Sequence, residues 1–471
     1  MNFPRDLGWR NMDLLYRSSV AYQFARYTLD LNYSLLPQDV IHQAKRSLLD
    51  TLGCALGAFE APGRSICESV AREIGGPEEA TVFCSGLRTS ALNATLVNSF
   101  LTRFLDANDI GGGGHNSDSI PAILAVCERE KAGGKDLLTS IVISYELGSR
   151  VIEAAGGKSK IESHGFTPDV RGGLSMPSAL GKIMALNEDQ IANAIGICAS
   201  GGLSLNIVDA DKEENFMKKN LRFGWVAHDA ILCCLLARKG FTGPVNIIEG
   251  DSGWQKSMFK GDMDLDALVD FSGWRILDTR HKVLCANGSS HGHLLATLAV
   301  VNENRIKPEE VASVLIKASP KEAHHTTTFT KKYPRTAENA DHSAFYMNAY
   351  IIKEGRLGPE SINPENYADP VILDLIEKIT VEELPGPPYI SFEGYSQIIT
   401  KDGRKFEKHV ACAHGFGDDP LTDKELEQKF TELTAKYISK KQINKIIDTV
   451  WNLEKLDKVS DLTKLMVFPA K

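Results

Sequence analysis

The sequence predicts a mainly α-helical protein with an inserted α+β domain, on three observations. Helical periodicity runs through residues 1–271, short β-branched segments appear within residues 272–414, and helical periodicity returns over residues 415–471. We therefore expect a large all-helical domain built from both termini and a smaller α/β lid domain inserted between its two parts. A length of 471 residues agrees with two or three domains.

Apolar residues three and four positions apart predict the helices of the first part. After Pro37, the residues Val40, Ile41, Ala44 and Leu48 share one helical face. The same spacing of apolar residues predicts helices over residues 92–104, 135–155, 188–200 and 224–240. Small residues are frequent in these segments, so we expect the helices to pack closely together.

Strand and turn signals predict the lid domain. Val311 to Ser319 form a short β-branched run, and two alternating runs flank Lys401-Asp402-Gly403, where Asp-Gly favours a hairpin turn. Thr422 and Glu425 then form a capping box at the start of an amphipathic helical tail. We expect this tail to pack back on the first helical part, which makes the lid domain an insertion.

Composition argues against several classes of protein. The net charge of −8 disfavours a general nucleic-acid binder, although a few Lys and Arg can still bind a small anion. No segment approaches the roughly 20 apolar residues of a membrane span, and residues 1–15 lack the apolar core of a signal peptide. Nine scattered cysteines without a CxxC pair indicate reduced core thiols. We expect a cytoplasmic protein without nucleic-acid or membrane partners.

The stretch LDANDIGGGGHNSD, residues 105–118, concentrates ionisable groups beside four glycines. Asp106 and Asp109 lie where the preceding helix ends, and His115 comes just before the next helix, whose N-terminus favours anions. Glycines let the backbone bend and approach a ligand closely. Spacing alone leaves two interpretations open: a loop that delivers acid–base groups into a cleft, or a mobile surface loop with ordinary caps.

Two lysine-bearing segments are further candidates. Lys219 lies just before the apolar segment of residues 224–240, where it is either a paired cation in a cleft or part of a solvated basic turn. Lys282 precedes Asn287 and His291, and His291 either faces a cleft or is a satisfied core histidine. The histidines have no partner at a recognisable ligand spacing, so we expect no metal site. The sequence contains no P-loop, GxGxxG or GxSxG motif.

Four segments, taken in order, carry a resemblance to a known family. They are AKRSLLDTLGCALGA, TLVNSFLTRFLDANDIGGGGHNSDSIPAILAVCE, DHSAFYMNAYII and SQIITKDGRKFEKHVACAHGFGDDPLTDKELEQKF. The second is similar to the most diagnostic segment of the MmgE/PrpD family, which is D-x-D-D, a short loop, and H-P-S before a helix. Order and spacing together make the chain resemble that family over most of its length.

The resemblance implies a fold and a chemistry. In the family, a large helical domain from both termini carries an α/β lid, usually in a homodimer, and the active site lies between the domains. Members include 2-methylcitrate dehydratase, cis-aconitate decarboxylase and an iminodisuccinate epimerase. They act on small di- and tricarboxylates without a metal or organic cofactor. We therefore expect a small anionic polycarboxylate substrate, no cofactor and a homodimer.

The resemblance also implies five catalytic residues. Asp106 and Asp109 match the first and last aspartates of D-x-D-D, and His115 matches the histidine of H-P-S. Lys219 matches the lysine before the buried helix, and Lys282 matches the lysine that opens the lid segment. The lysines would hold carboxylates and stabilise growing negative charge, while His115 would transfer the proton. The aspartates would orient these groups, or one would be the base.

The expected substrate contacts include three departures from the family pattern. Besides Lys219 and Lys282, we expect His291 to bind the substrate, because it matches the family histidine that starts the helix after the lid lysine. Ile110 stands where the decarboxylases have a threonine, and Thr167 replaces a family histidine. Asn287 stands where animal-type decarboxylases have a further histidine. These departures argue against the cis-aconitate reaction.

Three hypotheses follow from the sequence. The first is a cofactor-free lyase that dehydrates, or decarboxylates, a small polycarboxylate such as 2-methylcitrate, citrate or cis-aconitate. The second is an epimerase of an aminodicarboxylate, which needs proton transfer on opposite faces of one carbon and no leaving group. The third is a non-catalytic protein that keeps the family's fold.

Overall fold

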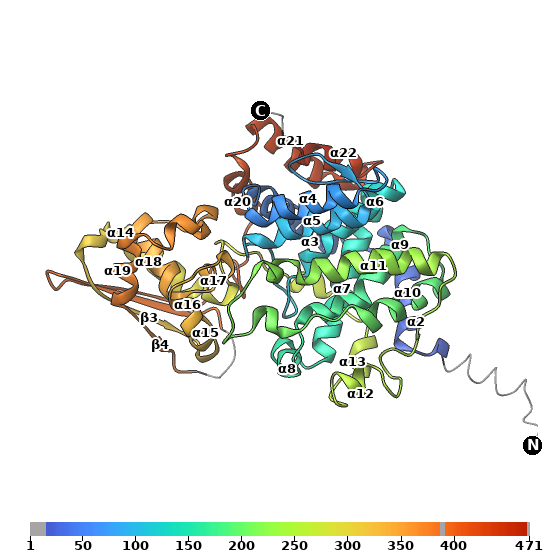
Figure 1. Cartoon of the computed structure of the whole chain (residues 1–471), viewed down its shortest axis with the longest axis horizontal. Helices are drawn as coiled ribbons and strands as arrows, with labels where there is room; N and C mark the ends of the chain where they lie inside the picture. Colours follow the sequence, from blue (N-terminus) through green and yellow to red (C-terminus); the bar gives the residue numbers. More distant parts are fainter. Residues whose placement is uncertain (1–15, 387–390, 469–471) are drawn as a thin grey trace, which may run out of the picture.

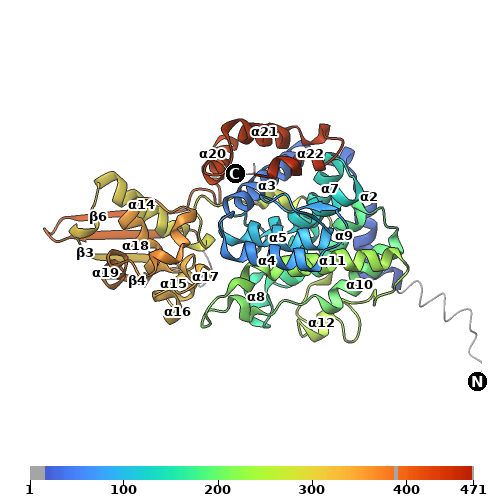
Figure 2. The same ribbon diagram turned by 45° about the horizontal axis from the view of Figure 1, so that its top comes forward.

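The computed structural model describes residues 16–386 and 391–468. Residues 1–15, on which the expectation of no signal peptide rests, lie outside the described part. A large helical domain and a smaller domain with a four-stranded sheet lie side by side, and the C-terminal helices return to the helical domain (Figures 1 and 2). The predicted fold class, mainly helical with an inserted α/β lid domain, is confirmed.

Two stretches of chain supply the helices of the helical domain. The first stretch forms α2 (Val20–Asp30), α3 (Gln38–Gly57), α4 (Pro62–Ile74), α5 (Ala91–Phe104), α6 (Ile120–Glu130), α7 (Gly134–Ala154), α8 (Lys158–Ser163), α9 (Gly172–Ile183), α10 (Glu188–Gly201), α11 (Arg222–Arg238), α12 (Trp254–Ser257) and α13 (Leu265–Val269). The second stretch forms α20 (Asp423–Thr434), α21 (Lys440–Trp451) and α22 (Ser460–Thr463). A short antiparallel pair joins β1 (Ala80–Thr81) to β2 (Arg88–Thr89). In the described part of the chain, no helix combines the length and apolar character needed to cross a membrane.

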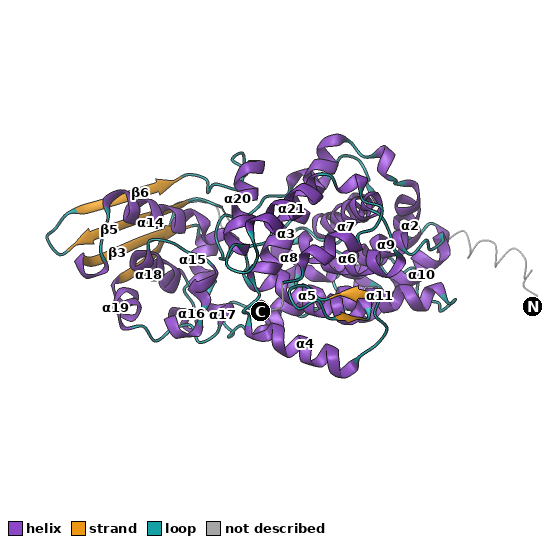
Figure 3. Ribbon diagram, turned by 90° about the horizontal axis from the view of Figure 1, so that it is seen from above, coloured by secondary structure: helices purple, strands orange, loops and turns teal. Residues whose placement is uncertain are grey.

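The lid domain packs helices against one mixed sheet, whose strands gather at one end of the molecule (Figure 3). Its helices are α14 (His291–Asn304), α15 (Pro320–Thr326), α16 (Phe329–Lys332), α17 (Ala337–Ala340), α18 (Ala344–Glu354) and α19 (Pro370–Lys378). Its strands are β3 (Val311–Ala318), β4 (Ile379–Glu383), β5 (Gly394–Thr400) and β6 (Lys405–Val410), in the order β4-β3-β5-β6. The strand predicted at Val311 and the hairpin at Asp402-Gly403 are confirmed, whereas β4 was not predicted.

Local signals in the sequence explain where several elements begin. The Asn187 and Thr422 side chains accept the backbone N–H three residues on and complete both predicted capping boxes. α14 lies on β5 because Gly292 and Gly394, which have no side chain, let the two backbones come into contact. A Cβ on Gly292 would lie 2.5 Å from the carbonyl carbon of Glu393. This close packing fixes the N-terminus of α14, which faces the helical domain.

One buried ion pair ties the C-terminal return to the functional loop. Lys429 on α20 places its Nζ 2.6 Å from Oδ1 of Asp50 on α3 and 2.6 Å from the carbonyl oxygen of Ala107. The pKa of Lys429 is raised because, although burial opposes its charge, Asp50 stabilises it. The last part of the chain therefore supports the backbone beside Asp106.

We expect Lys429→Met to lower the free energy of unfolding by about 3–5 kcal/mol, because it leaves the Asp50 carboxylate buried and unpaired. The double variant Asp50→Leu/Lys429→Met should recover much of that loss, because no uncompensated charge remains. Urea unfolding followed by circular dichroism measures both. If the single and double variants lose the same stability, the pair does not have this role.

Candidate active site

Asp106 lies at the centre of a buried cluster of charges between the two domains. Its carboxylate accepts hydrogen bonds from Arg103 on α5 and from Lys282, whose Nζ is 2.7 Å from Oδ1. The ammonium group of Lys219 lies 3.8 Å from Oδ2. Burial alone would raise the pKa of Asp106, but the three cations outweigh it and hold the pKa well below its usual range. Cations from distant parts of the chain therefore share one ionised carboxylate.

Local structure brings these groups together. Asp106 follows the end of α5 with a φ of 46°, a left-handed conformation that aspartate adopts more readily than most residues. Lys219 lies in the 3-10 turn Met217–Leu221, directly before α11. Lys282 lies in the crossover from the helical domain to the lid domain and also donates to the Asp106 carbonyl at 2.6 Å. The two lysines singled out in the sequence thus meet at the same aspartate.

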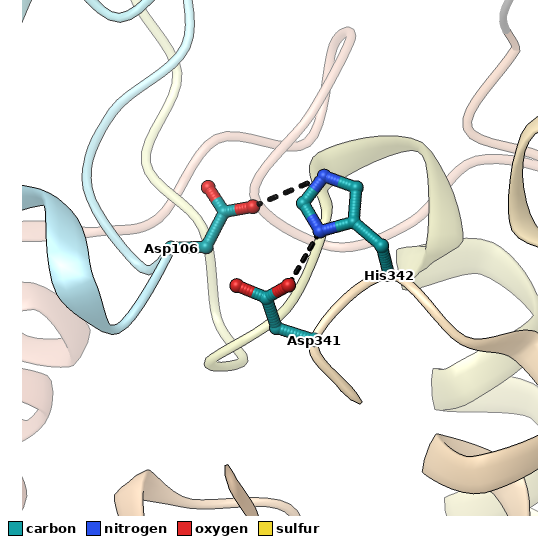
Figure 4. Close-up of side chains that lie close together, drawn as sticks. All are labelled: Asp106, Asp341 and His342. Atoms are coloured by element: carbon teal, nitrogen blue, oxygen red, sulfur yellow. Dashed lines mark hydrogen bonds and ion pairs between the residues drawn. The ribbon is translucent and has the colours of Figure 1, made fainter. Parts of the chain in front are cut away.

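The lid domain adds Asp341 and His342, two groups that the sequence did not single out as site residues. His342 Nε2 lies 3.6 Å from Oδ2 of Asp106, and its Nδ1 lies 2.5 Å from Oδ1 of Asp341 (Figure 4). Lys219 Nζ is 3.4 Å from Oδ2 of Asp341. The signal in the sequence was the segment DHSAFYMNAYII, which begins with these two residues and carries part of the family resemblance. Both domains therefore contribute to the charge cluster.

Asp106, Asp341 and His342 are the one group in the described residues whose ligand atoms could hold a metal ion, since those atoms lie within 4.8 Å of one another. However, the ammonium group of Lys219 lies within 4 Å of a carboxylate oxygen of each aspartate, and Lys282 contacts Asp106 as well. A divalent cation there would face two ammonium groups at short range. The cluster fits ammonium groups better than a metal, and we derive no step through a metal.

His115 has one nitrogen fixed and the other directed at the cluster. Its Nδ1 donates to the backbone carbonyl of Asp109 at 2.5 Å, and its Nε2 lies 3.9 Å from Oδ1 of Asp106. Burial, followed by the charges of Arg103 and Lys282, lowers the pKa of His115 well below its usual value. The imidazole is therefore neutral at pH 7, with an unprotonated Nε2 that can accept a proton.

A cavity of about 330 Å³ opens beside His115, between the glycine run and the start of α14. The residues that line it come from both domains and from the crossovers. They are Ile110, the glycines 111–114, His115, Lys158, Ser159, Pro168, Asp169, Arg222, Asp278, Arg280, Asn287, Gly288, Ser289, Phe392 and Phe416. The run turns tightly through Gly112 and Gly113, both with positive φ, and a Cβ on Gly112 would lie 2.8 Å from Oγ of Ser149. The glycines thus form a close-packed cavity wall.

Asp109 supports this wall and does not face the cavity. Its Oδ1 accepts from the backbone N–H of Ser117 at 3.1 Å, and its Oδ2 accepts from the hydroxyl of Tyr145 at 2.7 Å. Burial, partly offset by these hydrogen bonds, raises the pKa of Asp109 to about 6. Asp109 orients His115 through its backbone carbonyl, not through its carboxylate.

Four expected substrate contacts are fully buried and absent from the cavity lining: Lys219 and Lys282, which lie around Asp106, and Thr167 and His291. Thr167 caps the 3-10 turn Pro168–Arg171, where its hydroxyl accepts from the N–H of Asp169. His291 uses both nitrogens to hold the turn before α14, accepting from the N–H of Leu284 and bonding the carbonyl of Asn287. The structure brings neither Thr167 nor His291 to the cavity, because capping and loop contacts already occupy their polar atoms.

Two family models match most of the chain. The MmgE/PrpD N-terminal domain matches residues 22–266, and the MmgE/PrpD C-terminal domain matches residues 285–453. The chain belongs to the MmgE/PrpD family. The cis-aconitate decarboxylase-like protein oryM of Aspergillus oryzae is 24% identical over 483 residues, covering 95% of this chain and 97% of its own.

Other family relatives have similar identities and different named activities. The cis-aconitate decarboxylase of Homo sapiens is 23% identical over 471 residues, which cover 96% of this chain and 95% of the relative. The alkylcitrate dehydratase phiI of a fungal species is 26% identical over 451 residues, which cover 85% of this chain and 84% of the relative. At these identities the names leave the reaction of this MmgE/PrpD chain to be argued from its own cavity.

Two departures from the decarboxylase pattern lie on that cavity in this MmgE/PrpD chain. Ile110 and Asn287 both line it, next to Gly288 and Phe416. Ile110 pairs with Arg280 through backbone hydrogen bonds of 2.8 Å in each direction, so its position is set by the crossover. Both of these departures, expected from the family resemblance, therefore lie on the wall of this cavity.

We expect kcat/KM to fall as the pH rises through about 8, because Lys282 loses its proton there. Burial, opposed by Asp106, lowers the pKa of Lys282 to about 8, so the group is cationic below that pH and neutral above it. Lys282→Arg stays charged but cannot readily give up a proton, so turnover should fall to a small residual rate whose alkaline limb lies at higher pH. A pH–rate profile measures the shift.

Lys445→Ala, a change at an exposed lysine of α21, is the matched control and should keep the wild-type profile. An unchanged alkaline limb in Lys282→Arg would remove Lys282 from the titrating step.

Proposed function

We propose that the protein is a cofactor-free lyase that dehydrates a small 2-hydroxy di- or tricarboxylate, such as 2-methylcitrate or citrate. Relatives named as decarboxylases and as an alkylcitrate dehydratase support a lyase. The observation that carries the proposal is the position of His115, which lines the cavity and directs a neutral Nε2 at the Asp106 carboxylate. The Lys282 ammonium group is paired with the same carboxylate, behind the cavity wall at Gly288.

Dehydration requires one proton to leave carbon and one to reach the departing hydroxyl. His115 Nε2 can accept the proton from the carbon beside a carboxylate, and the released electron pair forms the carbon–carbon double bond. Lys282 can donate a proton to the hydroxyl, because a pKa of about 8 makes it an effective acid near neutral pH. Water and an unsaturated acid result, and the two side chains exchange protons with solvent to complete the cycle.

The negative charge of a bound substrate would raise the pKa of the proton acceptor, His115. In the empty site, burial and the nearby cations depress the pKa of His115, which makes it a weak base. A polycarboxylate in the cavity would place negative charge beside the imidazole and raise that pKa. Arg222 and Arg280 line the same cavity and can hold carboxylates away from the reacting carbon. The base would therefore strengthen only when substrate is bound.

An epimerase of an aminodicarboxylate is the second candidate, and a specific observation favours it. His115 from the helical domain and His342 from the lid domain both direct Nε2 at the Asp106 carboxylate. Two imidazoles on separate elements could serve opposite faces of one carbon. An epimerase would exchange a carbon-bound hydrogen with solvent and lose no water.

We expect the protein, incubated with a panel of small polycarboxylates in deuterated water, to convert one of the hydroxy acids. The product should show rising ultraviolet absorbance and a mass lower by one water. Deuterium uptake without these changes would instead indicate the epimerase, and no uptake into any acid would indicate a non-catalytic protein.

We expect His115→Gln to reduce that turnover by roughly two to four orders of magnitude, because glutamine cannot accept the proton. His409→Gln is the matched control, since His409 is an exposed histidine on β6 paired with Glu393. Its turnover should stay at the wild-type level. A loss under threefold in His115→Gln would remove His115 from proton transfer.

We also propose that two copies associate through the outer face of α11. Trp225 and Leu232, seven residues apart and so on one face of that helix, are 50% and 45% exposed. We expect a dimer by light scattering, and Leu232→Glu should shift it towards monomer because a buried carboxylate would be unpaired. A wild-type monomer would contradict this.

A further inference from the structure

A chain of hydrogen bonds runs from the cavity wall into the lid domain. Asn287 Nδ2 donates to Oγ of Ser289 at 3.0 Å, and Ser289 Oγ donates in turn to Oε2 of Glu322 on α15. Asn287 Nδ2 also lies 3.3 Å from the same carboxylate oxygen. Asn287 and Ser289 line the cavity, whereas Glu322 is 1% exposed and lies behind them.

The surroundings of Glu322 consist of hydrogen-bond donors. Ser290 donates its hydroxyl to Oε1, and Nε2 of His293 lies 3.9 Å from the same oxygen. His293 Nδ1 accepts from Nδ2 of Asn348 at 3.1 Å, so in the neutral ring the proton is on Nε2 and faces Glu322. Because the side chains around it are all hydrogen-bond donors, the Glu322 carboxylate acts only as an acceptor.

This arrangement fixes which end of the Asn287 amide faces the cavity. A carboxylate cannot donate to an amide oxygen, so the NH₂ group of Asn287 must face Ser289 and Glu322. The amide oxygen Oδ1 is therefore turned the other way, and it has no hydrogen-bond partner among the described residues. The hydroxyl proton of Ser289 is also committed to Glu322. This part of the cavity wall offers acceptors and no side-chain donor.

We propose that Asn287 Oδ1 accepts a hydrogen bond from the hydroxyl group of a 2-hydroxy acid, and that Glu322 is the positioning residue that keeps Oδ1 turned to the cavity. The inference rests on the proposed dehydration, because it names the contact of the group that leaves. The unsaturated product has lost the hydroxyl and cannot make this hydrogen bond, so Asn287 favours binding of the substrate over binding of the product.

The charges nearby select a neutral donor over an ammonium group. The Lys282 Cε lies 3.4 Å from where a Cβ on Gly288 would be, so this cation adjoins the wall next to Asn287. Arg222 and Arg280 line the same cavity. Lys158 lines it as well. Of the two carboxylates in the lining, Asp169 is already paired with Arg222 and Asp278 is exposed, so cations outnumber carboxylates there. An amino group would add a positive charge to a cavity lined by more cations than carboxylates, whereas a hydroxyl adds none.

The test compares two ligands that differ only in the hydroxyl, citrate and propane-1,2,3-tricarboxylate. We expect calorimetry to show that the wild-type protein binds citrate about tenfold more tightly, as one well-placed hydrogen bond allows. Asn287→Leu should bring the two dissociation constants within twofold, mainly by weakening citrate. Glu322→Gln should reduce the preference to about threefold or less, because either end of the Asn287 amide can then face the cavity.

A matched control separates positioning from folding. Glu128 is also a buried glutamate, but it is on α6, bonded to Thr81 and absent from the cavity lining. Glu128→Gln should keep the tenfold preference. If Glu322→Gln does not fold, Ser289→Ala replaces it, because that change breaks the same chain at the cavity and should also reduce the preference.

Each contrary outcome has a distinct meaning. Equal binding of the two acids by a wild-type protein that converts citrate overturns the hydroxyl contact and leaves the dehydration standing. Failure to bind either acid, together with no conversion of any hydroxy acid in the panel, overturns both proposals. An unchanged preference in Glu322→Gln, or an equal loss of affinity for both acids, overturns the positioning role of Glu322.

Discussion

The carboxylate of Asp106 is the constraint on which the two domains converge. Arg103 and Lys219 reach it from the helical domain, Lys282 from the crossover, and His342 from the lid domain. Each of these groups is almost fully buried, so any partner left unpaired would be costly. The charges of the cluster are therefore balanced across the domain boundary, because Lys219 pairs with Asp106 of its own domain and with Asp341 of the lid domain.

That balance shapes the chemistry around the cavity. Both lysines are paired with carboxylates of the protein. In the proposed reaction Lys282 would therefore supply a proton, and both lysines a fixed positive field, without the substrate having to neutralise them. His115 is neutral because burial and the charges of Arg103 and Lys282 lower its pKa, and in the proposed reaction a bound polyanion would make it a stronger base. The Asn287 amide, turned by Glu322, adds a contact for the hydroxyl. The proposed substrate must therefore carry negative charge for the cations and a neutral hydroxyl group for Asn287.

Periodicity, capping boxes and the Asp-Gly turn predicted the fold because those signals are local. β4 was missed because its pairing with β3 is long-range and only one of its five residues is buried, so it shows no alternation. Position in a family motif placed the two lysines and His115 near Asp106. It could not show that caps and loops occupy Thr167 and His291. Asp341 and His342 were missed because their role depends on contacts more than 100 residues away.

A crystal structure of the protein with citrate tests the account most directly. The account places citrate in the cavity beside the glycine run, with a carboxylate or the hydroxyl within hydrogen-bond distance of Lys282. It also keeps both Lys219 and Lys282 beside the Asp106 carboxylate. Citrate bound outside this cavity, or Lys219 and Lys282 turned towards separate regions of the protein, would contradict it.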